Sequence, residues 1–159
     1  MTRKRIALVA HDNRKQDLID WLKYNRQSFK NMDLFCTGTT GMLVEEALKN
    51  SETRQLEESI TITKLKSGPL GGDQQLGALI AEGKINMMVF FWDPMQPQAH
   101  DVDVKALLRI TVLYNIPTAC NRSTADFLIS SLLFDQEYNI TPMNLDYYIN
   151  RKIRPNYLI

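Results

Sequence analysis

The chain has little of several features that mark specialised protein classes. Its 159 residues include only two cysteines and two histidines, and 19 basic residues almost balance 18 acidic ones. A net charge of +1 provides no general electrostatic surface for nucleic acid or anionic lipid, although one or two cations at a helix start would still make a local anion site. The longest apolar run, residues 87–92, is too short to span a bilayer. We therefore expect a cytoplasmic protein without nucleic-acid or membrane partners.

The two cysteines lack the spacing of a redox pair or of a metal-binding pair. Cys36 and Cys120 lie near the ends of predicted strands, far apart in the sequence. We predict two free, buried thiols rather than a structural disulfide, because intracellular thiols are kept reduced.

Strand patterns alternate with helical patterns along the chain. Strands are predicted at Ile6–Ala10, Asp33–Thr37, Ser59–Leu65, Ile85–Trp92 and Ile116–Cys120. Helices are predicted around Leu18–Leu22, at Met42–Leu48, Gln75–Glu82 and Val104–Tyr114, from a Ser123–Thr124 cap to Ser130, and at Met143–Lys152. The charged segment Lys49–Glu58 is expected to be an exposed loop or a frayed helix extension. This alternation predicts a single domain over residues 1–159, a three-layer α/β/α fold with a doubly wound sheet of about five parallel strands.

Polar residues that a core cannot use follow four of the predicted strands. They are His11–Asp12, Thr37–Gly41, Ser67–Asp73 and Asp93. In a parallel α/β sheet the carboxyl ends of the strands gather on one edge, and ligands bind there. We therefore expect these four groups to converge on one site.

The stretch Ser67–Gln75 is the most informative of the four. It contains three glycines and one proline in nine residues, which predicts a tight bend without side chains in the way of a ligand. Asp73 stands at the end of this bend. We predict that its carboxylate is a base held over a small substrate.

The stretch Thr37–Gly41 has the composition of a phosphate cradle. Its hydroxyls and unobstructed N–H groups precede a helix, although a helix cap with turn glycines would have the same composition. Lys15 would supply a positive charge to the phosphate, or else be a solvated surface lysine. His11 would donate to the phosphate, or else be a hydrogen-bonded structural histidine.

The motif His100–Asp103 follows the fourth predicted strand. A histidine there can polarise a carbonyl, and a neighbouring carboxylate can fix its tautomer, while Asp103 could also cap the next helix. A metal site would need several convergent ligands, and nothing in the spacing of the histidines and acids favours one, so no metal is predicted. Nucleophilic catalysis by Cys36 or Ser67 is poorly supported, because no base is placed beside either residue.

Taken together, these motifs resemble the methylglyoxal synthase family, in order from Ile6 to Phe127. The blocks that carry the resemblance are Ala10–Asp12 with Lys15, Thr37–Gly41, Ser67–Gln75, Trp92–Pro94 and His100–Arg109. The combination of Thr37–Gly41 with Gly71–Gln75 is highly specific.

The resemblance implies a lyase that converts dihydroxyacetone phosphate to methylglyoxal and inorganic phosphate without a metal or organic cofactor. It further implies a homohexamer that phosphate inhibits with cooperativity. Asp73 would be the catalytic base, and His100 would face the carbonyl and enediolate oxygens, with Asp12, Asp93 and Asp103 as supporting acids. The phosphate would be bound by His11, Lys15, Thr37, Gly38, Thr39, Thr40, Ser67, Gly68 and a C-terminal cation, either Arg151 or Lys152.

Two other functions share this fold outline. A regulatory domain of the same type, as in carbamoyl phosphate synthetase, would bind phosphate without catalysis. A flavin-binding electron carrier would also have a threonine-rich phosphate loop. The presence of Asp73, His100 and Asp103 together favours the enzyme.

Overall fold

The computed structural model describes residues 3–49 and 59–151. Its strands form one sheet in the order β3-β2-β1-β4-β5, with every neighbouring pair parallel. The strands are β1 (Arg5–Ala10), β2 (Asp33–Thr37), β3 (Thr61–Leu65), β4 (Met87–Phe91) and β5 (Thr118–Ala119). The predicted α/β fold with a doubly wound parallel sheet is confirmed.

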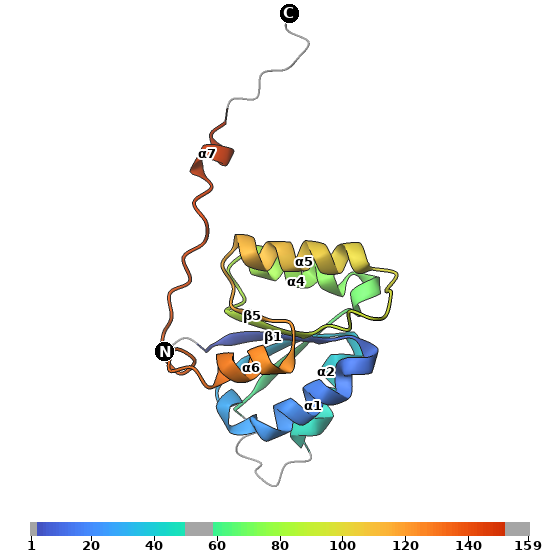
Figure 1. Cartoon of the computed structure of the whole chain (residues 1–159). Coiled ribbons are helices and arrows are strands. Elements are labelled where there is room, and N and C mark those ends of the chain that lie inside the picture. The colour runs from blue at the N-terminus through green and yellow to red at the C-terminus, as the bar shows by residue number, and fades with distance from the viewer. Residues whose placement is uncertain (1–2, 50–58, 152–159) are drawn as a thin grey trace, which may run out of the picture.

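Helices cover both faces of the sheet (Figure 1). One face carries α1 (Lys15–Tyr24), α2 (Gly38–Lys49) and α6 (Arg122–Ile129), and the other carries α4 (Gly72–Ala81) and α5 (Asp101–Leu113). Three 3-10 turns, η1 (Asp12–Arg14), η2 (Arg26–Phe29) and η3 (Gly68–Leu70), lie between these elements. The short helix α7 (Asp146–Ile149) stands away from this body (Figure 1). No helix among the described residues is long and apolar enough to cross a membrane.

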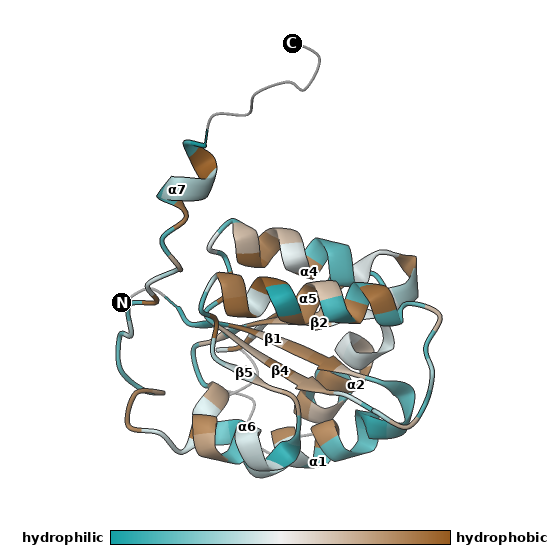
Figure 2. Ribbon diagram, turned by 45° about the horizontal axis from the view of Figure 1, so that its top comes forward, coloured by the Kyte–Doolittle hydropathy of each residue, from teal (hydrophilic) through white to brown (hydrophobic). Residues whose placement is uncertain are grey.

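Side chains of the central strand alternate between the two cores. Ile6 and Leu8 of β1 pack in the cluster that α1, α2 and α6 share, whereas Ala7 and Val9 pack in the cluster of α4 and α5. Figure 2 shows the resulting pattern, with apolar strands enclosed between helices that carry both apolar and polar residues. This period-2 burial on both faces explains why β1 and β4 are continuous apolar runs in the sequence.

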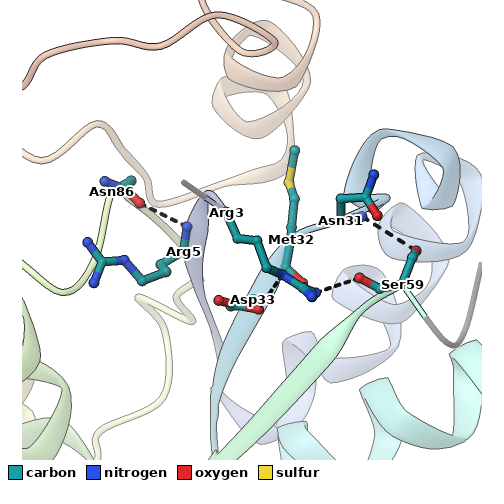
Figure 3. Close-up of polar contacts among 7 residues, drawn as sticks. All are labelled: Arg3, Arg5, Asn31, Met32, Asp33, Ser59 and Asn86. Atoms are coloured by element: carbon teal, nitrogen blue, oxygen red, sulfur yellow. Dashed lines mark hydrogen bonds and ion pairs between the residues drawn. The ribbon is translucent and has the colours of Figure 1, made fainter. Parts of the chain in front are cut away.

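The edge of the sheet where its strands begin is held together by side chains (Figure 3). Arg3 forms an ion pair with Asp33 at 2.8 Å and also donates to the carbonyl of Ser59, which lies just before β3. The backbone N–H of Arg5 donates to Asn86 Oδ1 at 2.9 Å, just before β4. These contacts help fix the register of neighbouring strands, and hence which residues meet at the opposite edge.

Three helices begin earlier than the sequence predicts. The structure starts α2, α4 and α5 at Gly38, Gly72 and Asp101, where the patterns predicted Met42, Gln75 and Val104. Gly38 has φ of +42°, which lets the chain pass from β2 straight into α2, and Gly71 has φ of +98° immediately before α4. The motifs expected in loops therefore form first helical turns.

Two predictions near the C-terminus, the cap of α6 and the helix at Met143–Lys152, differ from the structure. The cap of α6 is Asn121, whose side chain accepts from the N–H of Thr124, rather than the predicted Ser123–Thr124 pair. Within the described part of the tail only Asp146–Ile149 is helical. Lys152 and residues 50–58 lie outside the described residues.

Both thiols are free, as predicted. Cys36 is buried, and this burial raises the pKa of its thiol to about 12. Cys120 is only half-buried, so the expectation of burial holds for one cysteine of the two.

Candidate active site

A pocket of about 600 Å³ opens at the edge of the sheet where the strands end. Strand order reverses at β1, which pairs with both β2 and β4, and such a switch point is where α/β sheets bind ligands. The predicted site residues that line this pocket are His11, Asp12, Lys15, Thr37, Gly38, Thr39, Thr40, Ser67, Gly68, Asp73 and His100. The predicted convergence of polar strand ends is therefore observed for β1, β2 and β3. After β4 the pocket is lined by His100 rather than by Asp93, which was the residue predicted there.

A buried carboxylate and a buried imidazole meet on one wall of the pocket. Nδ1 of His100 lies 2.7 Å from Oδ2 of Asp73, and the two residues are 8% and 4% exposed. Asp73 lies in the first turn of α4, where the positive end of the helix dipole favours a negative charge. His100 immediately precedes α5. The carboxylate that contacts His100 is thus Asp73. The sequence had suggested a carboxylate next to His100 in the chain, within the motif His100–Asp103.

This contact restricts the hydrogen positions on His100. An ionised carboxylate only accepts, so the imidazole hydrogen lies on Nδ1 while Asp73 is charged. Nε2 of a neutral ring is then an acceptor, and it becomes a donor toward the pocket only when the ring is protonated.

Glycines let the backbone approach this pair closely. A Cβ on Gly68 would lie 2.7 Å from Cε1 of His100 and 3.0 Å from Oδ2 of Asp73. A Cβ on Gly38 would collide with Ser67, at 2.4 Å from its Oγ. The bend after β3 therefore packs against the two polar groups at Gly68, and the start of α2 packs against the bend at Ser67, with no room for a side chain at Gly68 or Gly38.

Another part of the pocket wall is suited to an anion. Thr39 and Thr40 stand in the first turn of α2, where N–H groups and the helix dipole favour negative charge. Nζ of Lys15 donates to Oγ1 of Thr39 and to Asp12, and the lysine side chain is only 18% exposed. Lys15 is therefore part of the pocket rather than a solvated surface residue. Its hydrogen bond and its charge hold the pKa of Asp12 below the usual range.

His11 also lines the pocket, and its ring is held by a backbone contact. The backbone N–H of Asp93 donates to Nδ1 of His11 at 3.2 Å, which leaves the hydrogen of the neutral ring on Nε2. Nε2 is buried and has no hydrogen-bond partner among the described residues. Burial, followed by the charge of His100, lowers the pKa of His11, which favours the neutral ring.

Three predicted site residues do not line the pocket: Asp93, Asp103 and Arg151. Asp93 accepts from Asn13 and from the N–H of Met95, bonds that lower the pKa of its carboxyl. Asp103 lies in the first turn of α5, and α5 has no side-chain cap, so the alternative that Asp103 caps this helix is wrong. The guanidinium of Arg151 stacks 3.4 Å from the centre of the Tyr148 ring, beyond α7.

Several pocket residues were not found from the sequence. Gln98 lines the pocket, and Met42 and Leu43 add apolar wall from α2. The position of Gln98 two residues before His100 was the only available signal, since nothing in its local pattern distinguishes it from a loop residue. Among the described residues, no three His, Cys, Asp or Glu side chains are grouped so that they could hold a metal ion.

Comparison with known families gives a consistent set of matches. Residues 17–120 match the family described as the MGS-like domain. The methylglyoxal synthase of Maridesulfovibrio salexigens is 54% identical over 153 residues, covering 94% of this chain and 98% of that protein. The methylglyoxal synthase of Coxiella burnetii (strain RSA 493) is 48% identical over 153 residues, covering 96% of this chain and 100% of that protein.

A solved structure has the same fold. The crystal structure of methylglyoxal synthase from Elizabethkingia anophelis NUHP1 superposes with a TM-score of 0.83 at 45% sequence identity. The match covers 96% of this chain and 93% of that one.

Proposed function

This chain belongs to the MGS-like family together with the methylglyoxal synthases it resembles, and we propose that it is a lyase that converts dihydroxyacetone phosphate to methylglyoxal and inorganic phosphate. One observation carries this assignment to the site itself. The buried Asp73–His100 pair and the anion wall formed by α2 and Lys15 line the same pocket. A base and a phosphate grip are the two devices that this reaction needs.

In the proposed reaction, the phosphate of the substrate binds against the anion wall. The N-terminal turn of α2 and the ammonium of Lys15 stabilise its negative charge, and Ser67 and Gly68 close the other side. Nε2–H of His11, which has no hydrogen-bond partner within residues 3–49 and 59–151, is available to donate to a phosphate oxygen. The substrate carbons then extend toward Asp73.

Asp73 is proposed to act as the base. Its carboxylate takes the hydrogen of the hydroxymethyl carbon, and the electron pair of that C–H bond forms the enediolate with the carbonyl carbon. Nδ1–H of His100 holds one carboxylate oxygen, which leaves the other free for the substrate. A protonated His100 would also donate from Nε2 to the developing oxyanion.

The second step breaks the bond between carbon and the phosphate ester oxygen. Electrons of the enediolate expel inorganic phosphate by β-elimination, and the resulting enol tautomerises to methylglyoxal. Elimination requires the ester bond to stand out of the enediolate plane, whereas an isomerase holds it in the plane and returns the proton. The phosphate grip is therefore the feature that we expect to decide between the two products.

The remaining predicted residues take supporting parts in the proposal. Asp12 holds Lys15, Asp93 holds the ring of His11, and Asp103 lies one turn from His100. The helix α7 stands away from the body of its own chain (Figure 1), and we propose that Arg151, which follows this helix, reaches the phosphate of a neighbouring copy. Mixing Asp73→Asn chains with Arg151→Ala chains would then restore part of the activity that each lacks, and no recovery would contradict this exchange.

We propose that the chain assembles as a homohexamer and that phosphate inhibits it cooperatively. Large apolar side chains exposed on the single chain support burial against other copies, including Phe127, Leu132, Tyr147 and Ile149. Inorganic phosphate would compete for the same anion wall as the substrate. Light scattering gives the mass in solution, and rates measured against phosphate concentration give the cooperativity. The free thiols support a cytoplasmic location, where cysteines stay reduced.

The test of the function is an assay of purified protein with dihydroxyacetone phosphate. We expect methylglyoxal and inorganic phosphate to appear in equal amounts. Phosphate binding without turnover would instead support the non-catalytic regulatory domain, and absence of both would overturn the site assignment.

A further inference from the structure

Asn13 joins two segments that border the pocket. It lies in η1, directly after His11 and Asp12, and its side-chain Nδ2 donates to Oδ2 of Asp93 at 3.0 Å and to Oε1 of Gln96. Both acceptors belong to the loop between β4 and α5, which also carries His100. No chemistry in the proposed reaction uses Asn13, and it does not line the pocket.

The hydrogen bonds of Asp93 show what this contact holds in place. Its Oδ1 accepts from the N–H of Met95 at 3.0 Å, while its Oδ2 accepts from Asn13. Each carboxylate oxygen thus has a donor, and the turn after β4 is held from both sides. Its own backbone N–H then points at Nδ1 of His11, at 3.2 Å.

The ring of His11 depends on that N–H for its tautomer. The backbone N–H of His11 already donates to the carbonyl of Phe91 at 3.2 Å, so the end of β1 is attached to the end of β4. Nδ1 accepts from Asp93, and Nε2 is buried without a partner in the described part of the chain. The charged or titratable groups that act on this ring are Asp93, Asp101 and His100.

We propose that Asn13 is a positioning residue. It keeps Asp93 in the conformation whose N–H donates to Nδ1 of His11, so that His11 carries its hydrogen on Nε2 and donates it to the phosphate group of the bound ligand. The part that concerns the ligand rests on the proposed function. The part that concerns the tautomer does not, because it follows from contacts within the chain.

The first test observes the ring in the wild-type protein. Nitrogen-15 NMR of labelled histidines, at a pH where the rings are neutral, is expected to show His11 protonated on Nε2 and unprotonated on Nδ1. In Asn13→Ala, the His11 signals should move toward a mixture of tautomers. The opposite tautomer in the wild-type protein would overturn the proposal without any substitution.

The second test measures the affinity for inorganic phosphate by calorimetry. Asn13→Ala is expected to weaken binding about two- to tenfold, the range for one lost hydrogen bond. Asn13→Asp should weaken it further, because a second carboxylate would repel that of Asp93. Gln16→Ala is the matched control, since it removes an exposed side-chain amide that donates to Asp20 one turn along α1, and it should leave affinity unchanged.

A double substitution separates positioning from general loosening of the fold. In a His11→Gln background the tautomer no longer exists, so adding Asn13→Ala should cost little further affinity. Fully additive losses of phosphate affinity in the double variant would overturn the proposal. The proposal would also fail if Asn13→Ala had the same histidine signals and the same phosphate affinity as Gln16→Ala. None of these readouts uses turnover, so a failed product assay would contradict the proposed function while leaving this inference to its own tests.

Discussion

Asp73 and His100 are 27 positions apart in the sequence, yet their Oδ2 and Nδ1 atoms lie 2.7 Å apart in the buried wall of the pocket. The carboxylate comes from the first turn of α4 and the imidazole from the residue before α5. These helices pack side by side on one face of the sheet (Figure 1). Asp73 is therefore fixed within α4, and His100 is fixed at the point where the loop after β4 enters α5, which suits a base that must keep its position.

Asp73→Asn replaces the proposed base by a neutral side chain of the same shape. We expect turnover to fall about 10²- to 10⁴-fold, the usual contribution of a general base, with little change in phosphate affinity. The exposed acid Asp20 provides the control, since Asp20→Asn should keep wild-type turnover. A near-normal rate for Asp73→Asn in a product assay would mean that another group removes the proton.

Lys15→Ala removes the cation from the anion wall. We expect the KM for dihydroxyacetone phosphate to rise about tenfold to a hundredfold, as for loss of a hydrogen bond to a charged group. Lys23→Ala, which removes an exposed lysine from the last turn of the same helix, should leave KM unchanged. Equal KM values for the two variants would remove Lys15 from the phosphate site.

Gly68→Ala tests the close approach of the bend to the catalytic pair. The new methyl group would meet Cε1 of His100 at 2.7 Å, so the imidazole or the bend must shift. Because misplacement of catalytic groups by about 1 Å can cost about 10²-fold, we expect a loss of that order in kcat.

Gly77→Ala is the matched control within α4, because a Cβ at that position meets no atom within 4 Å. It should keep full activity and raise the free energy of unfolding by about 0.5–1 kcal/mol, since alanine favours helix over glycine. Equal activity losses in the two variants would mean that the loss in Gly68→Ala does not come from the contact with His100.

The lowered pKa of His11 predicts how the free energy of unfolding changes with pH. Its pKa in the folded protein is below the usual 6.5, so the folded state binds fewer protons than the unfolded state as pH falls through that value. Stability should therefore be complete above the usual pKa and decline toward the lower folded pKa. The carboxyls of Asp12 and Asp93, whose pKa values are also lowered, act in a more acidic range.

The check is urea unfolding between about pH 5 and 8 for the wild-type protein and for His11→Gln. The wild-type protein should lose stability on acidification more steeply than the variant. Parallel curves would contradict the assignment of this pH dependence to His11.

Local patterns predicted most of the fold because they depend on residues close in sequence. The strand Asp33–Thr37 was predicted with its observed bounds, since its alternation and flanking residues are clear. The start of α2 was missed because Gly38 and Gly41 suggest a loop, whereas a positive φ at Gly38 in fact starts a helix. The cap by Asn121 was missed for a similar reason, because the serine and threonine that follow it are equally good caps.

The sequence predicted most of the residues that gather at the site, but not the contacts between them. Sheet order brings the carboxyl ends together, so His11, Thr37 and Asp73 were found from their positions after strands. The partner of His100 was not, because the contact with Asp73 depends on how α4 packs on α5. Asn13 was missed as well, since its acceptors lie on a loop about 80 positions away.

We propose that one pocket combines a base with a phosphate grip that directs elimination. The most direct test of this proposal is the product ratio when purified protein acts on dihydroxyacetone phosphate, with methylglyoxal, inorganic phosphate and glyceraldehyde 3-phosphate measured together. We expect equal amounts of methylglyoxal and phosphate, without accumulation of glyceraldehyde 3-phosphate. Accumulation of glyceraldehyde 3-phosphate, or an unchanged substrate, would contradict the proposal.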